Sequence, residues 1–136
     1  MTTPPHRLNP DRDFIPVRIA ILAVSDTRGL DQDKSGDVLQ GRIEKAGHIL
    51  AARTILRDER AEIADQLRAW CADPEIDVVI STGGTGLTGR DVTVEAHRDV
   101  YEKEIEAFAT IFSLVSYQKI GTSAVQSRAT GGVANG

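Results

Sequence analysis

The chain has 136 residues, with a hydrophobic content of 40%, a charged content of 26% and a formal net charge of −4, as is typical of one ordinary globular domain. The acidic balance, and apolar runs that all fall short of the ~18 residues of a membrane span, argue against nucleic acid and membrane as partners. Cys71 is the single cysteine, which excludes an internal disulfide and a cysteine-based zinc site and favours the reducing cytoplasm as the location.

The N-terminal part of the chain changes character near residue 16. Residues 1–16 contain four of the five prolines and predict a flexible arm, which Phe14 and Ile15 would pin to the domain formed by residues 17–136. Residues 17–24 form an almost continuous apolar run, as in a central strand that is covered on both faces. The run ends at Ser25 and Asp26, where polar turn residues begin.

Helical and strand patterns then alternate along the chain. Ser35 is a suitable N-cap, and Gly47 a suitable closing residue, for a helix between them. A strand over residues 48–56, a helix opened by Asp58 or Glu59, and a strand over residues 76–82 follow. Strands that alternate with helices through short connections predict a three-layer α/β/α fold around a mostly parallel sheet.

Two further helices are expected in the second half. One covers residues 92–97, and the other covers residues 104–115. The second carries an apolar face, which is either part of the ordinary core or a contact between subunits. The side chains of that face are Ile105, Phe108, Ile111, Phe112 and Val115.

The loop after the third strand carries the strongest functional signal. Gly83, Gly84 and Gly86 follow the strand directly, and Asp91 comes a few residues later. Glycines let backbone N–H groups approach an anion, so this order favours a phosphate site at the carboxyl end of a buried strand. The alternatives are a tight turn that needs glycine for backbone reasons alone and, for Asp91, an N-cap of the following helix.

Two general nucleotide-binding motifs overlap this loop, and neither fits. Residues 84–89 satisfy G-x-G-x-x-G, but a dinucleotide site also needs a second strand ending in an acid ~20 residues on, where this sequence is helical. The same glycines have the spacing of a P-loop, but Arg90 and Asp91 stand where that motif requires Lys and Ser or Thr.

Taken in chain order, the polar motifs resemble those of molybdenum cofactor biosynthesis proteins of the MoaB/MogA type. The resemblance extends from about residue 17 to residue 135, and the stretch of residues 119–129 looks like the MoaB branch in particular. The fold that it implies is the Rossmann-like molybdopterin-binding domain. The motifs are Ser25-Asp26, Asp33 to Gly36, Asp58-Glu59, Gly83 to Gly86, Arg90 to Thr93 and Ser127-Arg128.

The activity implied by this resemblance is the adenylylation of molybdopterin. The terminal phosphate of molybdopterin would attack the α-phosphorus of ATP, with Mg²⁺ as cofactor and pyrophosphate as product. Asp58 and Asp91 match the two acidic positions associated with Mg²⁺ and catalysis. The positions that match binding residues are Ser25 and Asp26 at the pocket rim, Gly83, Gly84, Thr85, Gly86 and Thr93 around the phosphates, and Ser127 on the molybdopterin side.

Two alternatives within the resemblance stay open: a pterin-binding protein that does not turn over its ligand, and a trimeric scaffold domain. The family implies a homotrimer, sometimes paired into a hexamer. It also continues, where this chain ends at Gly136, into a last strand, a loop and a closing helix. The resemblance therefore predicts that a C-terminal segment is missing.

Overall fold

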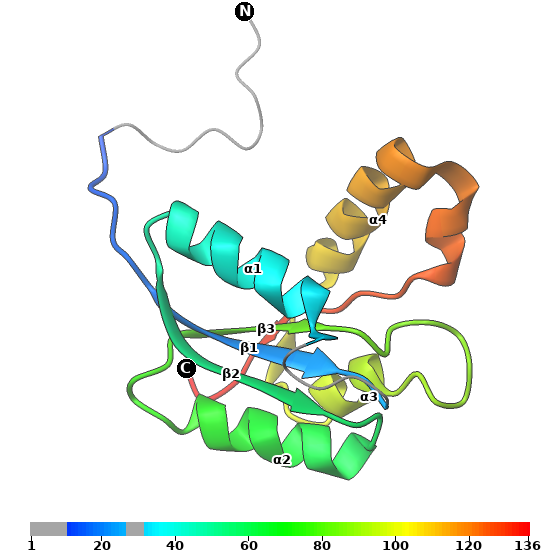
Figure 1. The fold of residues 1–136 in the computed structure, drawn as a ribbon, viewed down its shortest axis with the longest axis horizontal. Helices are drawn as coiled ribbons and strands as arrows, with labels where there is room; N and C mark the ends of the chain where they lie inside the picture. Colours follow the sequence, from blue (N-terminus) through cyan, green and yellow to red (C-terminus); the bar gives the residue numbers. More distant parts are fainter. Residues whose placement is uncertain (1–10, 27–31) are drawn as a thin grey trace, which may run out of the picture.

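The computed structural model describes residues 11–26 and 32–136, so most of the predicted arm over residues 1–16 lies outside the described residues. Its main sheet has three strands, and Figure 1 shows helices covering both faces of this sheet. The elements of this first part are β1 (Arg18–Val24), α1 (Lys34–Lys45), β2 (Ile49–Leu56), α2 (Arg60–Cys71) and β3 (Val78–Thr82).

The three strands form a parallel sheet in the order β2-β1-β3. This confirms the predicted parallel sheet and α/β layering. Parallel strands end at the same edge of a sheet, so Val24, Leu56 and Thr82 bring the segments that follow them to one place.

The apolar run of β1 is explained by alternation between two cores. Ala20, Leu22 and Val24 point to one face, where they pack with Ile63, Leu67 and Trp70 of α2 and with Ala96. Ile19 and Ile21 point to the other face, where they meet Ile43 of α1. A central strand with helices on both sides therefore needs apolar residues at every position.

The start of α1 differs from the sequence prediction. Asp33, not Ser35, is the N-cap, and its side chain accepts a hydrogen bond from the N–H of Gly36. Asp33 is buried and also pairs with Arg53 of β2, with 3.2 Å between Nη2 and Oδ2. This contact with a distant strand favours Asp33 over Ser35, although both residues are good caps locally.

The second part of the chain begins with α3 (Thr93–Arg98) and continues with β4 (Lys103–Glu104), α4 (Glu106–Ile120), the 3-10 helix η2 (Gly121–Gln126) and β5 (Gly132–Val133). The strands β4 and β5 form an antiparallel pair. Within the part of the chain that the structure describes, no helix is both long and apolar enough to cross a membrane.

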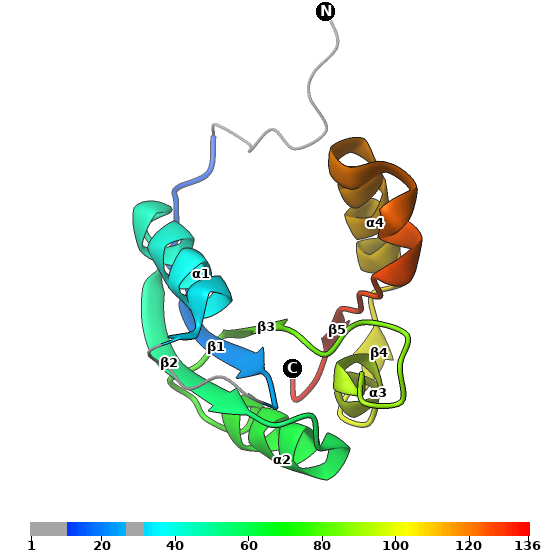
Figure 2. The ribbon, with the colours of Figure 1, turned by 45° about the vertical axis from the view of Figure 1, so that its right-hand side comes forward.

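The helix α4 stands apart from the sheet in both ribbon views (Figure 1, Figure 2) and has no buried residue. The interpretation of its apolar face as ordinary core is therefore wrong. Phe108 is 49% exposed and Ile111 is 58% exposed. Leu114 and Ile120 are exposed as well, so the helix is apolar on more than the predicted face.

Candidate functional site

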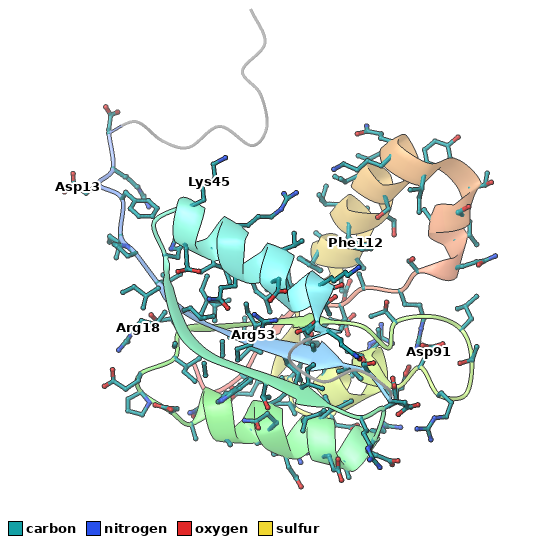
Figure 3. The ribbon with its side chains drawn as sticks, in the orientation of Figure 1. Asp13, Arg18, Lys45, Arg53, Asp91 and Phe112 are labelled. Atoms are coloured by element: carbon teal, nitrogen blue, oxygen red, sulfur yellow. The ribbon has the colours of Figure 1, made fainter. Side chains whose placement is uncertain are left out.

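A cavity of about 270 Å³ lies at the carboxyl edge of the parallel sheet. Its walls are the ends of β1 and β2, the start of α1 and the loop after β3. Figure 3 shows Asp91 on this loop, beyond the ends of the strands. Six of the predicted site residues line the cavity: Ser25, Asp26, Asp58, Gly83, Gly84 and Asp91.

The glycines of the loop are required by the protein itself. Gly83 and Gly84 have φ angles of +93° and +64°, in the left-handed region that favours glycine. A Cβ on Gly83 would lie 2.2 Å from the carbonyl oxygen of Val24. A Cβ on Gly84 would lie 2.3 Å from Oγ1 of Thr93 and 2.7 Å from Oδ1 of Asp58. The case for a ligand therefore depends on the groups that the loop brings together, and not on the glycines alone.

Thr93 at the start of α3 fixes this turn. It is 3% exposed, its Oγ1 donates to the carbonyl of Gly83 at 2.7 Å, and its N–H donates to the carbonyl of Gly84 at 3.1 Å. Among the described residues, no acceptor takes the N–H of Gly84 or of Thr85. Of these two residues, Gly84 lines the cavity, where an anion such as a phosphate can accept a hydrogen bond from its N–H.

Asp91 is held by its own loop and does not cap α3. Its Oδ2 accepts from the N–H of Thr88 at 3.0 Å and from Oγ1 of Thr88 at 2.8 Å. The N-cap position of α3 belongs to Val92, which makes no side-chain cap bond. The hydrogen bonds from Thr88 lower the pKa of Asp91 and hold its carboxylate ionised.

Arg128 fixes the same loop from the other side. Its guanidinium donates to the carbonyls of Gly86 at 2.9 Å and Asp91 at 2.7 Å, and it pairs with the carboxylate of Glu95 in α3. Its backbone N–H also donates to the carbonyl of Thr85, at 2.9 Å. Sequence analysis singled out its neighbour Ser127 and gave Arg128 no role, because no local pattern indicates contacts with residues so distant in the sequence.

Two further acids of the cavity, Asp26 and Asp58, lie close together after β1 and β2. Asp26 accepts from the N–H of Asp58 at 3.1 Å and pairs with Arg90, with 2.8 Å between Nη2 and Oδ1. The guanidinium of Arg90 lowers the pKa of Asp26. Burial, and then the negative charge of Asp26, raise the pKa of Asp58. Asp58 is thus the acid of the cavity whose charge is least compensated.

Asp58 and Asp91 suit a magnesium ion that is shared with phosphate. Among the described residues, no three His, Cys, Asp or Glu side chains lie close enough together to enclose a metal ion. Mg²⁺ in phosphate-transfer sites commonly takes only one or two carboxylates, together with waters and phosphate oxygens. The raised pKa of Asp58 marks a negative charge that a cation would stabilise.

The other predicted binding residues lie outside this cavity. Thr93 donates its hydrogen bonds to the carbonyls of the turn, and the carbonyls of Thr85 and Gly86 accept hydrogen bonds from Arg128. A second cavity of about 340 Å³ is lined by Leu87, Thr88, Gly89, Asp91, Val92, Glu95 and Arg128. Asp91 lines both cavities, whereas Ser127 lines neither of them.

Comparison with known proteins gives consistent results. Residues 20–135 match a family described as "Probable molybdopterin binding domain". The chain is 45% identical over 123 residues to molybdenum cofactor biosynthesis protein B of Escherichia coli K12, covering 90% of this chain and 72% of that protein. A crystal structure of a molybdenum cofactor biosynthesis protein B superposes with a TM-score of 0.86 at 40% identity, over 90% of this chain and 77% of the other. The tungsten cofactor synthesizing protein MoaB from Pyrococcus furiosus superposes with a TM-score of 0.77 at 31% identity, over 89% and 75%.

Proposed function

This chain belongs to the molybdopterin-binding domain family of molybdenum cofactor biosynthesis proteins, and on that premise we propose that it adenylylates molybdopterin with Mg²⁺ and ATP. In this reaction a phosphate oxygen of molybdopterin bonds to the α-phosphorus of ATP. The bond from that phosphorus to the oxygen bridging to the β-phosphate breaks, and pyrophosphate leaves.

The observation that carries the proposal is the meeting of Asp58 and Asp91 in one cavity. The two acids follow different strands and are 33 positions apart by their numbering. Beside them lies Gly84, whose backbone N–H suits a phosphate oxygen. Phosphoryl-type transfer depends mainly on positioning and on charge neutralisation, which is what such a set of groups supplies.

Each acid has a different supporting environment, which suits a different part in the reaction. Asp91 is ionised and oriented by Thr88, so it provides a fixed negative charge at the end of the loop. Asp58 packs against Gly84 and carries the less compensated charge. These two carboxylates would hold a magnesium ion, and the chemistry that the ion would supply is neutralisation of the phosphate charge.

The direct test is the release of pyrophosphate from ATP, Mg²⁺ and molybdopterin. We expect Asp91→Asn and Asp58→Asn to lower the rate about a hundredfold or more, because each change removes a charge that positions the reacting groups. Asp65→Asn is the control, since Asp65 is an exposed acid of α2 that pairs with Arg68. Molybdopterin binding by the parent protein without pyrophosphate release would reject adenylylation and leave a binding protein of the same pathway.

We further propose that the protein assembles as a homotrimer, or as a hexamer of two trimers, through α4. Support comes from the apolar side chains that α4 leaves in solvent, including Phe108, Ile111 and Leu114, because surfaces of this kind commonly mark subunit contacts. Light scattering of the parent and of Ile111→Ser provides the test. A parent that is monomeric at micromolar concentration would refute the proposal.

A further inference from the structure

The cavity at the sheet edge has a charge that is unsuited to an anionic ligand. Four carboxylates line it, from Asp26, Asp33, Asp58 and Asp91. Asp33 pairs with Arg53, which it shares with Asp37, whereas the other three line the cavity without that partner. Of the lining residues that the structure describes, Arg90 is the one with a cationic side chain. Without a bound metal ion, a ligand that carries phosphate needs such a cationic side chain, because the backbone N–H groups supply only partial charge.

Arg90 is already bound, and its partner is one of those carboxylates. Its Nε lies 3.1 Å from Oδ2 of Asp26, and its Nη2 lies 2.8 Å from each oxygen of the same carboxylate. Asp26 follows β1 and Arg90 belongs to the loop after β3, so the pair joins two walls of the cavity. The guanidinium therefore presents to Asp26 the same donor fork that fits a phosphate group.

This ion pair is easily exchanged. The side chain of Arg90 is 63% exposed and that of Asp26 is 35% exposed, and ion pairs in such solvated positions contribute little to stability. Asp26 would keep a donor after the exchange, since its Oδ1 also accepts from the N–H of Asp58. Moving the guanidinium to a phosphate leaves no buried group without a partner.

We propose that Arg90 is the phosphate-binding side chain of this cavity and that Asp26 competes with the phosphate for it. The ligand class is a phosphate ester or a polyphosphate, the chemistry that ATP and molybdopterin share. The inference rests on the proposed function only for the location of the site. Asp26 then sets the affinity by holding Arg90 when no phosphate is bound.

The test is calorimetric binding of inorganic triphosphate and of inorganic monophosphate, without magnesium, at fixed ionic strength. Arg90→Gln removes a charge-assisted contact, so we expect triphosphate binding to weaken about ten- to a hundredfold. Asp26→Asn removes the competing charge but keeps an oxygen for the N–H of Asp58, so we expect binding to tighten about two- to fivefold. In the double variant, Asp26→Asn should bring no gain, because the residue that it releases is absent.

The pair Arg60–Asp99 provides a matched control. It is also an ion pair of an arginine with an aspartate, with 2.7 Å between Nε and Oδ2 and side-chain exposures of 54% and 32%, and it lines neither cavity. Arg60→Gln and Asp99→Asn should leave phosphate binding unchanged. If they shift it as the cavity variants do, the effect is one of net charge and the proposal is wrong.

The remaining outcomes also decide the question. Weaker binding in Asp26→Asn would overturn the competition, since the pair would then act as one structural unit. Failure of both the parent and Asp26→Asn to bind triphosphate at millimolar concentration would overturn the assignment of Arg90. An effect of Arg90→Gln on triphosphate alone assigns the contact to the nucleotide, and an equal effect on monophosphate assigns it to a single phosphate, as on the pterin. The assay needs no turnover, so the proposed adenylylation can fail while this result stands.

Discussion

Replacing Gly84 by alanine should strongly destabilise the protein. The residue has a φ of +64°, and the added Cβ would lie 2.3 Å from Oγ1 of Thr93 and 2.7 Å from Oδ1 of Asp58. A left-handed conformation costs a non-glycine residue about 1–2 kcal/mol, and overpacking of this kind costs about 1–3 kcal/mol. The sum is about 2–5 kcal/mol, a large part of the stability of an ordinary domain.

Urea unfolding measures this loss, and two other glycines serve as controls. Nothing lies within 4 Å of a Cβ added at Gly89 or at Gly41, and neither residue has a positive φ. Gly89→Ala should change the free energy of unfolding by less than about 1 kcal/mol. Gly41→Ala, in the middle of α1, should stabilise the protein by about 1 kcal/mol, because alanine is the better helix former.

The comparison among the three variants tests the reasoning. If Gly84→Ala is as stable as Gly89→Ala, the turn can rearrange freely and its geometry does not depend on glycine. If Gly84→Ala is destabilised but Gly41→Ala is destabilised equally, the loss comes from glycine replacement in general and not from the contacts of this turn. Only a selective loss at Gly84 supports the packing of Thr93 and Asp58 against the loop.

Three further variants test the electrostatics of the site. Asp58 has a raised pKa in the folded protein, so its ionised form opposes folding. Thermal unfolding at pH 7 should therefore show that Asp58→Asn is more stable than the parent. This gain should shrink as the pH falls through the raised pKa of Asp58. The Nδ1 and Nε2 atoms of His97 contact the carbonyl of Thr93 and the hydroxyl of Ser81, and burial lowers its pKa. The parent should therefore lose stability as the pH falls below about 6.5, and His97→Gln should lose less over the same interval; equal losses would show that His97 is not the group responsible. Arg128→Lys keeps the charge, but a lysine cannot reach Gly86, Asp91 and Glu95 together. Urea unfolding should therefore show a free energy of unfolding that is lower by about 2 kcal/mol. An unchanged unfolding midpoint would contradict the role of Arg128 in fixing the loop.

Local pattern was enough to predict the layered sheet. The seven residues of β1 are apolar at almost every position because each side of the strand has its own core. Gly47 has a φ of +87° and lies just after α1, as its place in the sequence predicts. Features of this kind depend on neighbours along the chain, which a sequence shows directly.

Other features depend on partners that are distant in the sequence. Asp33 rather than Ser35 caps α1 because Arg53 of β2 reaches it, and helical spacing contains no sign of that contact. The apolar positions of residues 104–115 correctly predicted a helix. Their spacing alone cannot tell which surface covers the apolar face of that helix. The roles of all the predicted site residues toward a ligand stay predictions, whereas the contacts of Arg128 came only from the folded arrangement.

The central place of β1 has a consequence for synthesis of the protein. It is the first strand of the sheet to leave the ribosome, yet both of its partners, β2 and β3, come later, and the second pairing needs Thr82. Until then the nascent chain exposes a seven-residue apolar strand with at least one unpaired edge, a segment that associates readily with other chains. The strand β3, which completes the sheet, also leads into the glycine loop. The cavity therefore forms only when the exposed edge of β1 has been paired.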